Sequence, residues 1–183
     1  AGVRFEDVNT DGFIDILHSR DQGNIQITYF NNVTGWTEYT QWKPPLFFIN
    51  NNIDAGVQFI DFNGDGRIDI LVAGDNTNQS YINTGSGWKN VSSTLVSPVE
   101  FILVKDTGVR IIDFNADGLP DIINTSSAYL NNGSGWVNYN GYSSPVGFST
   151  GDSDTGVRIV DVNGDGLPDL LENFVNGTQS SRG

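Results

Sequence analysis

One nine-residue motif occurs four times in the chain, and this internal repeat constrains the fold more than any other feature of the sequence. The copies read "DVNTDGFID", "DFNGDGRID", "DFNADGLPD" and "DVNGDGLPD", and they begin at Asp7, Asp61, Asp113 and Asp161, at intervals of 54, 52 and 48 residues. Periods of roughly 20 to 50 residues are typical of solenoids, propellers and arrays, in which each unit stacks on its neighbours. We therefore expect the 183 residues to form one repeat array.

Each copy of the motif lies between two segments with strand character. The segment before it, such as "GVQFID", alternates apolar and polar residues, so that Val57 and Phe59 share one face. The segment after it, such as "IDILVAG", reads as a second strand. In the first three copies a third and a fourth strand follow around an Asn/Gly turn, as in "SYINTGSGWKNV". Each full repeat therefore predicts a four-stranded antiparallel meander, the size of one β-propeller blade.

The sequence thus predicts an all-β, propeller-type array of about 3.5 blades. It forms a single domain over residues 1–183, with repeats at about 1–50, 54–100 and 106–148 and a partial repeat at about 154–183. Three and a half blades do not close a normal ring, and an unfinished blade leaves a strand edge that must be paired or covered. We expect the chain to be part of a larger propeller, or to be completed by another subunit or a second copy at this open edge.

The repeated motif has the chemistry of a calcium loop. In the pattern D-x-N-x-D-G-x-x-D, positions 1, 3, 5 and 9 carry side-chain oxygens, position 7 offers a backbone carbonyl, and the glycine at position 6 permits a sharp turn. Oxygen ligands in a flexible loop suit calcium better than magnesium. Four calcium ions would offset most of the net charge of −13. The alternative is a set of acidic Asn/Gly turns that bind no metal.

The repeats resemble the FG-GAP/VCBS repeats of integrin α-type β-propellers. The sequence segments "GVRIVDVNGDGLPDLL" and "YLNNGSGW" are most similar to the repeats of toxin-complex and SpvB-like secreted proteins. This resemblance covers nearly the whole chain and implies about four structural calcium ions. It implies the following ligands, with position 7 contributing its carbonyl: Asp7, Asn9, Asp11, Phe13 and Asp15; Asp61, Asn63, Asp65, Arg67 and Asp69; Asp113, Asn115, Asp117, Leu119 and Asp121; Asp161, Asn163, Asp165, Leu167 and Asp169.

Four tryptophans are candidates for packing or for ligand contact. Trp36, Trp88 and Trp136 recur at one place in the repeat, which favours packing between blades over a role as platforms for sugar rings. Trp42 lies in the irregular stretch "YTQWKPPLFFINNN" and breaks the repeat. Trp42 is therefore the better candidate for a ligand or contact surface, and burial under a long loop is the alternative.

Two further repeated positions carry charge. An aspartate precedes each "AGV" or "TGV" from the second repeat onward, which is typical of a side chain that caps a turn. An arginine follows "GV" in three repeats, and we expect it to pair weakly with the loop carboxylates. The aspartates are Asp54, Asp106 and Asp154, and the arginines are Arg4, Arg110 and Arg158, with Gln58 in the second repeat.

Composition excludes several classes of function. An excess of 22 acidic over nine basic residues argues against nucleic acid and anionic membranes as partners, and no apolar run predicts membrane insertion. There is no cysteine, and the single histidine, His18, has no catalytic partner, so we expect no enzyme activity. The candidate N-glycosylation sites are Asn32, Asn78, Asn90, Asn124, Asn132 and Asn176.

These features together predict a secreted, extracellular or cell-surface module that is stabilised by calcium and has a structural or adhesive role. Its expected partners are other protein subunits or further copies of itself, and its assembly is expected to be filamentous. The main alternative is a carbohydrate-binding propeller lectin with glycans as ligands. A further alternative is the non-catalytic propeller of a larger secreted enzyme or toxin. These alternatives rest on analogy at the level of the fold.

Overall fold

The computed structural model confirms the predicted all-β array and describes residues 2–74, 77–102, 106–150 and 153–172. Its strands form antiparallel sheets, here called blades 1 to 4, which follow one another along the chain. Blade 1 contains β1 (Val3–Glu6), β2 (Asp15–Arg20), β3 (Ile25–Asn31) and β4 (Trp36–Glu38); blade 2 contains β7 (Val57–Ile60), β8 (Asp69–Gly74), β9 (Thr77–Asn83) and β10 (Trp88–Asn90); blade 3 contains β11 (Arg110–Ile112), β12 (Asp121–Ile123), β13 (Ala128–Asn131) and β14 (Trp136–Asn138). Blade 4 contains β17 (Val157–Val160) and β18 (Asp169–Glu172) in the described part of the chain.

Short hairpins lead the chain into blades 2 and 4, and the sequence did not reveal them. After β4 the chain makes the 3₁₀ turn η1 (Thr40–Trp42) and then the hairpin of β5 (Ile49–Asn50) and β6 (Ile53–Asp54). Strand β5 pairs in parallel with the end of β2, through Arg20 and Ile49, so the hairpin extends the sheet of blade 1. A second hairpin, β15 (Ser149–Thr150) and β16 (Ser153–Asp154), leads into blade 4. Each hairpin delivers the chain to the first strand of the next blade.

The hydrophobic core is divided into three clusters, each of which joins two successive blades. In the first cluster, Leu17 and Phe48 of blade 1 and its hairpin pack against Ile70 and Val72 of blade 2, and all four side chains are fully buried. The second cluster joins blades 2 and 3, and the third joins blades 3 and 4. Alternation along each strand places one set of side chains toward the preceding blade and the other toward the following blade. The stacking of blades therefore provides most of the apolar burial.

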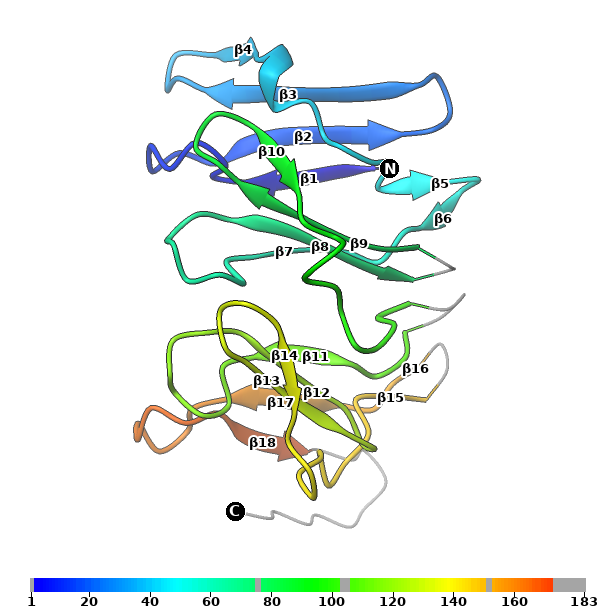
Figure 1. Ribbon diagram of the computed structural model, residues 1–183, viewed down its shortest axis with the longest axis vertical. Helices are drawn as coiled ribbons and strands as arrows, with labels where there is room; N and C mark the ends of the chain where they lie inside the picture. Colours follow the sequence, from blue (N-terminus) through cyan, green and yellow to red (C-terminus); the bar gives the residue numbers. More distant parts are fainter. Residues whose placement is uncertain (1, 75–76, 103–105, 151–152, 173–183) are drawn as a thin grey trace.

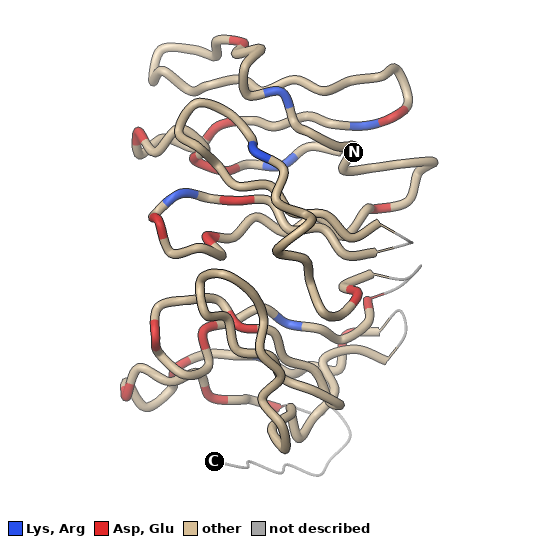
Figure 2. The backbone as a smooth tube through the Cα atoms, viewed as in Figure 1, with Lys and Arg blue, Asp and Glu red and all other residues tan. Residues whose placement is uncertain are grey.

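The four acidic loops lie on the same side of the array. Figure 1 shows the sheets stacked along the long axis, with the turns that join β1 to β2, β7 to β8, β11 to β12 and β17 to β18 on the left and the connecting hairpins on the right. Figure 2 shows acidic residues recurring along that left side. Because every blade has the same strand order, the motif reaches the same end of each sheet. The repeat thus produces a row of acidic loops.

The second residue of the acidic motif tests how much the stacking of blades contributes to stability. Val8 is fully buried in the cluster between blades 1 and 2, whereas Val162, at the same motif position in blade 4, is 59% exposed. We expect Val8→Ala to lower the free energy of unfolding by roughly 2 kcal/mol, from lost apolar burial and the cavity that remains. Val162→Ala should change it by less than about 0.5 kcal/mol. Urea unfolding followed by tryptophan fluorescence measures both; equal effects would contradict this view of the core.

Candidate functional site

Each acidic loop is a compact turn held by its own carboxylates. In the second loop, Asp61 accepts hydrogen bonds from the backbone N–H groups of Gly64 (2.8 Å), Asp65 (3.1 Å) and Gly66 (2.7 Å). Asn63 Oδ1 accepts the N–H of Asp65 at 2.9 Å, and Asp65 Oδ1 accepts the N–H of Arg67 at 2.9 Å. The other three loops repeat most of these bonds. The side chains at positions 1, 3 and 5 are thereby held against the backbone of one turn by hydrogen bonds to its N–H groups.

The loop needs left-handed backbone at two positions. Position 6 is always glycine, with φ between 84° and 90°. Position 4 is also left-handed, and there glycine occurs only in the second and fourth loops; Thr10 (φ 60°) and Ala116 (φ 59°) occupy it in the first and third. A side chain bearing Cβ is disfavoured in this region, so these two residues strain their loops.

The carboxylate at position 9 fastens the loop to the rest of its blade. Asp15 Oδ2 accepts the N–H of Val8 at 3.2 Å, and its Oδ1 accepts the N–H of Asn31, on the third strand, at 3.0 Å. Asp121 makes the same two contacts in blade 3, and Asp69 makes the contact to the third strand in blade 2. All three carboxylates are fully buried. One side chain thus joins the loop, the second strand and the third strand.

Burial of these carboxylates disfavours their charged form. The pKa of Asp69 is raised to about 7, mainly by burial; the neighbouring carboxylates of Asp65 and Asp61 contribute to this shift, and the hydrogen bond from the N–H of Asn83 opposes it. Burial likewise raises the pKa of Asp121 to about 6. A cation bound beside such a group would favour the carboxylate and reverse this shift.

The donor groups of the loops fit calcium in their chemistry. Every predicted ligand atom is an oxygen, and Asp69 Oδ2 is buried without a well-formed hydrogen bond in the described part of the chain. A buried, unpaired carboxylate oxygen is costly unless another group satisfies it. Within the same residues, no three acidic or histidine side chains converge closely enough to hold an ion by themselves. A calcium ion would therefore also need the Asn oxygen and the backbone carbonyl that the motif provides.

One asparagine in each of the first three blades belongs to these loops, although the sequence did not single it out. Asn31, Asn83 and Asn131 end the third strands, and each accepts a backbone N–H in its own turn. Asn83 and Asn131 also reach the acidic loop of the preceding blade. The signal available in the sequence was their recurrence immediately after "YF", "YI" and "YL".

The structure corrects the proposed role of Trp42. Trp42 is only 4% exposed and packs edge-to-face against Trp88, with ring centroids 5.6 Å apart, so it belongs to the core and not to a contact surface. Trp88 and Trp136 also pack against the clusters between blades, as predicted. Trp36, in blade 1, is 50% exposed. Trp42 shares the buried cluster between blades 1 and 2 with Phe30 and Phe48, so it is one of the side chains that join these blades.

The arginines pair with the turn aspartates and not with the loop carboxylates, which corrects the predicted pairing. Arg4 contacts Asp54 at 2.8 Å, and the Arg110–Asp106 and Arg158–Asp154 pairs are 3.1 and 3.0 Å apart. The aspartates also accept the N–H of the glycine two residues later, as predicted for turn caps. Among the described residues, the loop carboxylates form one ion pair, between Arg67 and Asp65 of the second loop at 3.2 Å.

The remaining predicted positions differ in their surroundings. Asn32, Asn90 and Asn132 are exposed. Asn78 is also exposed, but its amide pairs with the backbone of Ser97. Asn124 is half-buried and Asn176 lies outside the described residues.

Burial lowers the pKa of His18, the single histidine of the chain. No helix in the described part has the length and apolarity needed to cross a membrane.

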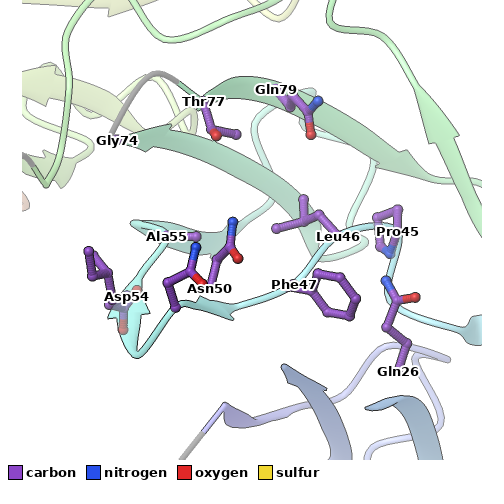
Figure 3. Close-up of a pocket in the computed structure, with 12 residues that line it drawn as sticks. Gln26, Pro45, Leu46, Phe47, Asn50, Asp54, Ala55, Gly74, Thr77 and Gln79 are labelled. Carbon is purple, nitrogen blue, oxygen red and sulfur yellow. The ribbon is translucent and has the colours of Figure 1, made fainter. Parts of the chain in front are cut away.

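A separate cavity of about 330 Å³ opens beside the hairpin that follows blade 1. Amide and carboxylate side chains and one aromatic ring line it, among them Gln26, Phe47, Asn50, Asp54 and Gln79. Figure 3 shows these side chains, which come from both blade 1 with its hairpin and blade 2. Such a mixture of hydrogen-bonding groups with a ring can bind a small polar ligand.

The chain belongs to the FG-GAP-like repeat family, whose model matches residues 7–72, 61–124 and 113–172. No curated protein shows significant similarity to the chain. Among solved structures, the fold is similar to that of an Agrocybe aegerita lectin that recognises non-reducing terminal N-acetylglucosamine. The TM-score is 0.61 and the identity 20%, and the match covers 92% of this chain. The chain spans 45% of that lectin's length. It also matches a chain of the Photorhabdus luminescens Tc holotoxin pore (TM-score 0.34, 13% identity), covering 94% of this chain and 11% of that one.

The strain at position 4 of the loops gives a reciprocal pair of substitutions. Ala116→Gly should raise the free energy of unfolding by about 0.5–1 kcal/mol, because glycine adopts the left-handed conformation without a Cβ penalty. Gly64→Ala should lower it by about 1–3 kcal/mol, since its new Cβ would also lie 2.9 Å from Leu119 Cδ2. Chemical denaturation in chelator measures both effects. Changes of the same sign would contradict the assigned backbone conformation.

Proposed function

We propose that this chain is a non-catalytic, extracellular structural module in which calcium fastens each acidic loop and the rigid blades bind another protein. The observation that carries the proposal is the row of four oxygen-lined loops on one side of the array. Crowded carboxylates repel one another without a cation, and the buried aspartates at position 9 add a desolvation cost. Calcium would offset both costs and would favour the folded blade.

Exposed apolar side chains on blade 1 support a role in assembly with other proteins. Blade 1 exposes Phe5 (61%) and Trp36 (50%), whereas their counterparts in blade 2, Phe59 and Trp88, pack against the cluster between blades. Large exposed apolar side chains on one sheet favour contact with another protein surface. We infer that blade 1 binds a protein subunit or a second copy, and that the assembly is extracellular because its stability depends on abundant calcium.

Calcium titration tests the metal part of the proposal. We expect isothermal titration to show about four calcium ions per chain, with magnesium binding much more weakly. At 100 times the dissociation constant, one such site would stabilise the fold by about 2.7 kcal/mol. The double substitution Asp61→Asn with Asp65→Asn should remove one ion, because it takes both charges from positions 1 and 5 of the second loop.

A matched control and a second measurement complete this test. Glu38→Gln removes a charge from an exposed strand residue outside the loops and should leave the stoichiometry unchanged. Light scattering after size exclusion, in calcium and after chelation, reports whether the chain associates with itself. Identical unfolding curves in calcium and in chelator, with no heat of binding, would refute the calcium role.

Carbohydrate binding is the second candidate function, and the cavity beside the first hairpin favours it. Its amides and the Asp54 carboxylate offer donors and acceptors for sugar hydroxyls, and Phe47 offers an apolar surface. The lectin with a similar fold, which recognises terminal N-acetylglucosamine, supports this candidate only by analogy. Since Trp42 is buried, the ligand would contact this cavity and not that tryptophan.

A glycan array followed by titration tests this second candidate. We expect saturable binding of a neutral glycan, which Asn50→Ala should weaken about tenfold through the loss of a hydrogen-bonding side chain at the cavity wall. Asn90→Ala, an exposed asparagine on β10, is the control and should bind as the unsubstituted chain does. No binding on the array, or equal affinities for the two variants, would refute carbohydrate binding at this cavity and leave the structural role as the remaining proposal.

A further inference from the structure

Asn83 contacts two acidic loops at once. Its Nδ2 donates a hydrogen bond of 2.8 Å to the carbonyl of Val8, in the first loop, across 75 residues of chain. The same Nδ2 donates at 3.2 Å to the carbonyl of Ile68, and the backbone N–H of Asn83 donates at 2.8 Å to Asp69 Oδ1, both in the second loop. The side chain is fully buried. One residue of blade 2 is therefore bonded to the loops of blades 1 and 2.

Asn131 repeats this arrangement one blade further along. Its Nδ2 donates at 2.7 Å to the carbonyl of Phe62 in the second loop, and its backbone N–H donates at 2.8 Å to Asp121 Oδ1 in the third loop. It is 3% exposed. The recurrence at two junctions of different sequence shows that the contact belongs to the geometry of the repeat. Hydrogen bonds of Asn83 thus link the first loop to the second, and those of Asn131 link the second loop to the third.

The bonded carbonyls lie at a sensitive place in the loops. Val8 and Phe62 occupy motif position 2, between the ligand positions 1 and 3. The carbonyl of position 2 belongs to the peptide that joins positions 2 and 3, so a hydrogen bond to it fixes the backbone between the ligands at positions 1 and 3. Groups that orient metal ligands without touching the metal typically change its affinity 10- to 100-fold when they are removed. The asparagine of the following blade is thus placed to set the orientation of two ligands.

We propose that Asn83 and Asn131 are positioning residues that couple calcium binding in consecutive loops, so that an ion in one loop strengthens binding in the next. This inference rests on the proposed calcium role. An ion that orders the second loop fixes Asp69 and, through it, Asn83, whose amide then holds the first loop in its binding conformation. Coupling of this kind is reciprocal, because each site must affect the other by the same factor.

Asn31 provides a matched control within the same chain. It occupies the same position in blade 1, its Oδ1 accepts the N–H of Val33 at 2.9 Å, and its backbone N–H donates to Asp15. Asn83 makes the equivalent bonds to Gly85 and Asp69. Among the described residues, however, the Nδ2 of Asn31 contacts no other blade. Substitution of Asn31 by alanine therefore removes the turn contact alone, whereas the same change at Asn83 also removes the bond between loops.

The experiment compares calcium titrations of the complete chain and of its Asn83→Ala and Asn31→Ala variants. For Asn83→Ala we expect about tenfold weaker binding at two sites and loss of positive cooperativity, while Asn31→Ala stays within about twofold of the unsubstituted chain. Hydrogen exchange then locates the effect: calcium should protect residues 7–15 less in Asn83→Ala. Asp61→Asn, in the second loop, should also reduce calcium protection of the first loop, but not further when combined with Asn83→Ala.

The stability gained on adding calcium separates coupling from simple packing. A merely structural asparagine would lower stability equally in calcium and in chelator, whereas a positioning residue reduces the gain itself. If Asn83→Ala does not fold, Asn131→Ala repeats the comparison for the second and third loops. Calcium binding in which the asparagine variants match Asn31→Ala would overturn the coupling alone. A chain that binds no calcium at all would overturn both the coupling and the proposed function.

Discussion

The rest of a blade depends on the hydrogen bonds of the carboxylate at motif position 9, which is buried in the first three acidic loops. Asp15 and Asp121 each bond to the start of their own loop and to the third strand, and Asp69 bonds to the third strand. The loop therefore cannot move without disturbing the sheet. Burial makes the charged form of such a group unfavourable, so a counter-charge in the loop would stabilise the fold.

The division of the core explains how one side of the molecule can be highly acidic without loss of packing. Apolar side chains such as Leu71 and Ile122 meet in the clusters between blades, and the loops, at the ends of the sheets, add the buried side chains of Val8 and Phe62 to these clusters. Neutralising a loop would change the rigidity of a blade but would leave its packing faces intact. In the proposed function calcium therefore acts on stability, and recognition belongs to the exposed sheet and the cavity beside the first hairpin.

The sequence was sufficient for the parts of the fold that local patterns determine. Alternation around Val57 and the Asn/Gly turns defined the strands, and the repeat defined the blades. It was insufficient where distant residues meet. The parallel pairing of Ile49 with Arg20 depends on how the connecting hairpin folds back onto blade 1, and the burial of Trp42 and the bond from Asn83 to Val8 depend on how one blade lies on the next. The loop residues were identified by their spacing, and their assignment as calcium ligands stays a prediction.

Because each apolar cluster lies at a junction and not inside a blade, the unit that carries stability is the junction. Gene duplication or deletion that adds or removes one whole repeat changes the number of junctions and leaves the chemistry of each remaining one unaltered. Recombination within a repeat, in contrast, would separate Asp69 from Asn83 and so break the bond that fastens the second loop to its own blade. The structure thus predicts where the coding sequence of such arrays tolerates crossovers: in the connecting hairpins, between the fourth strand of one blade and the first strand of the next.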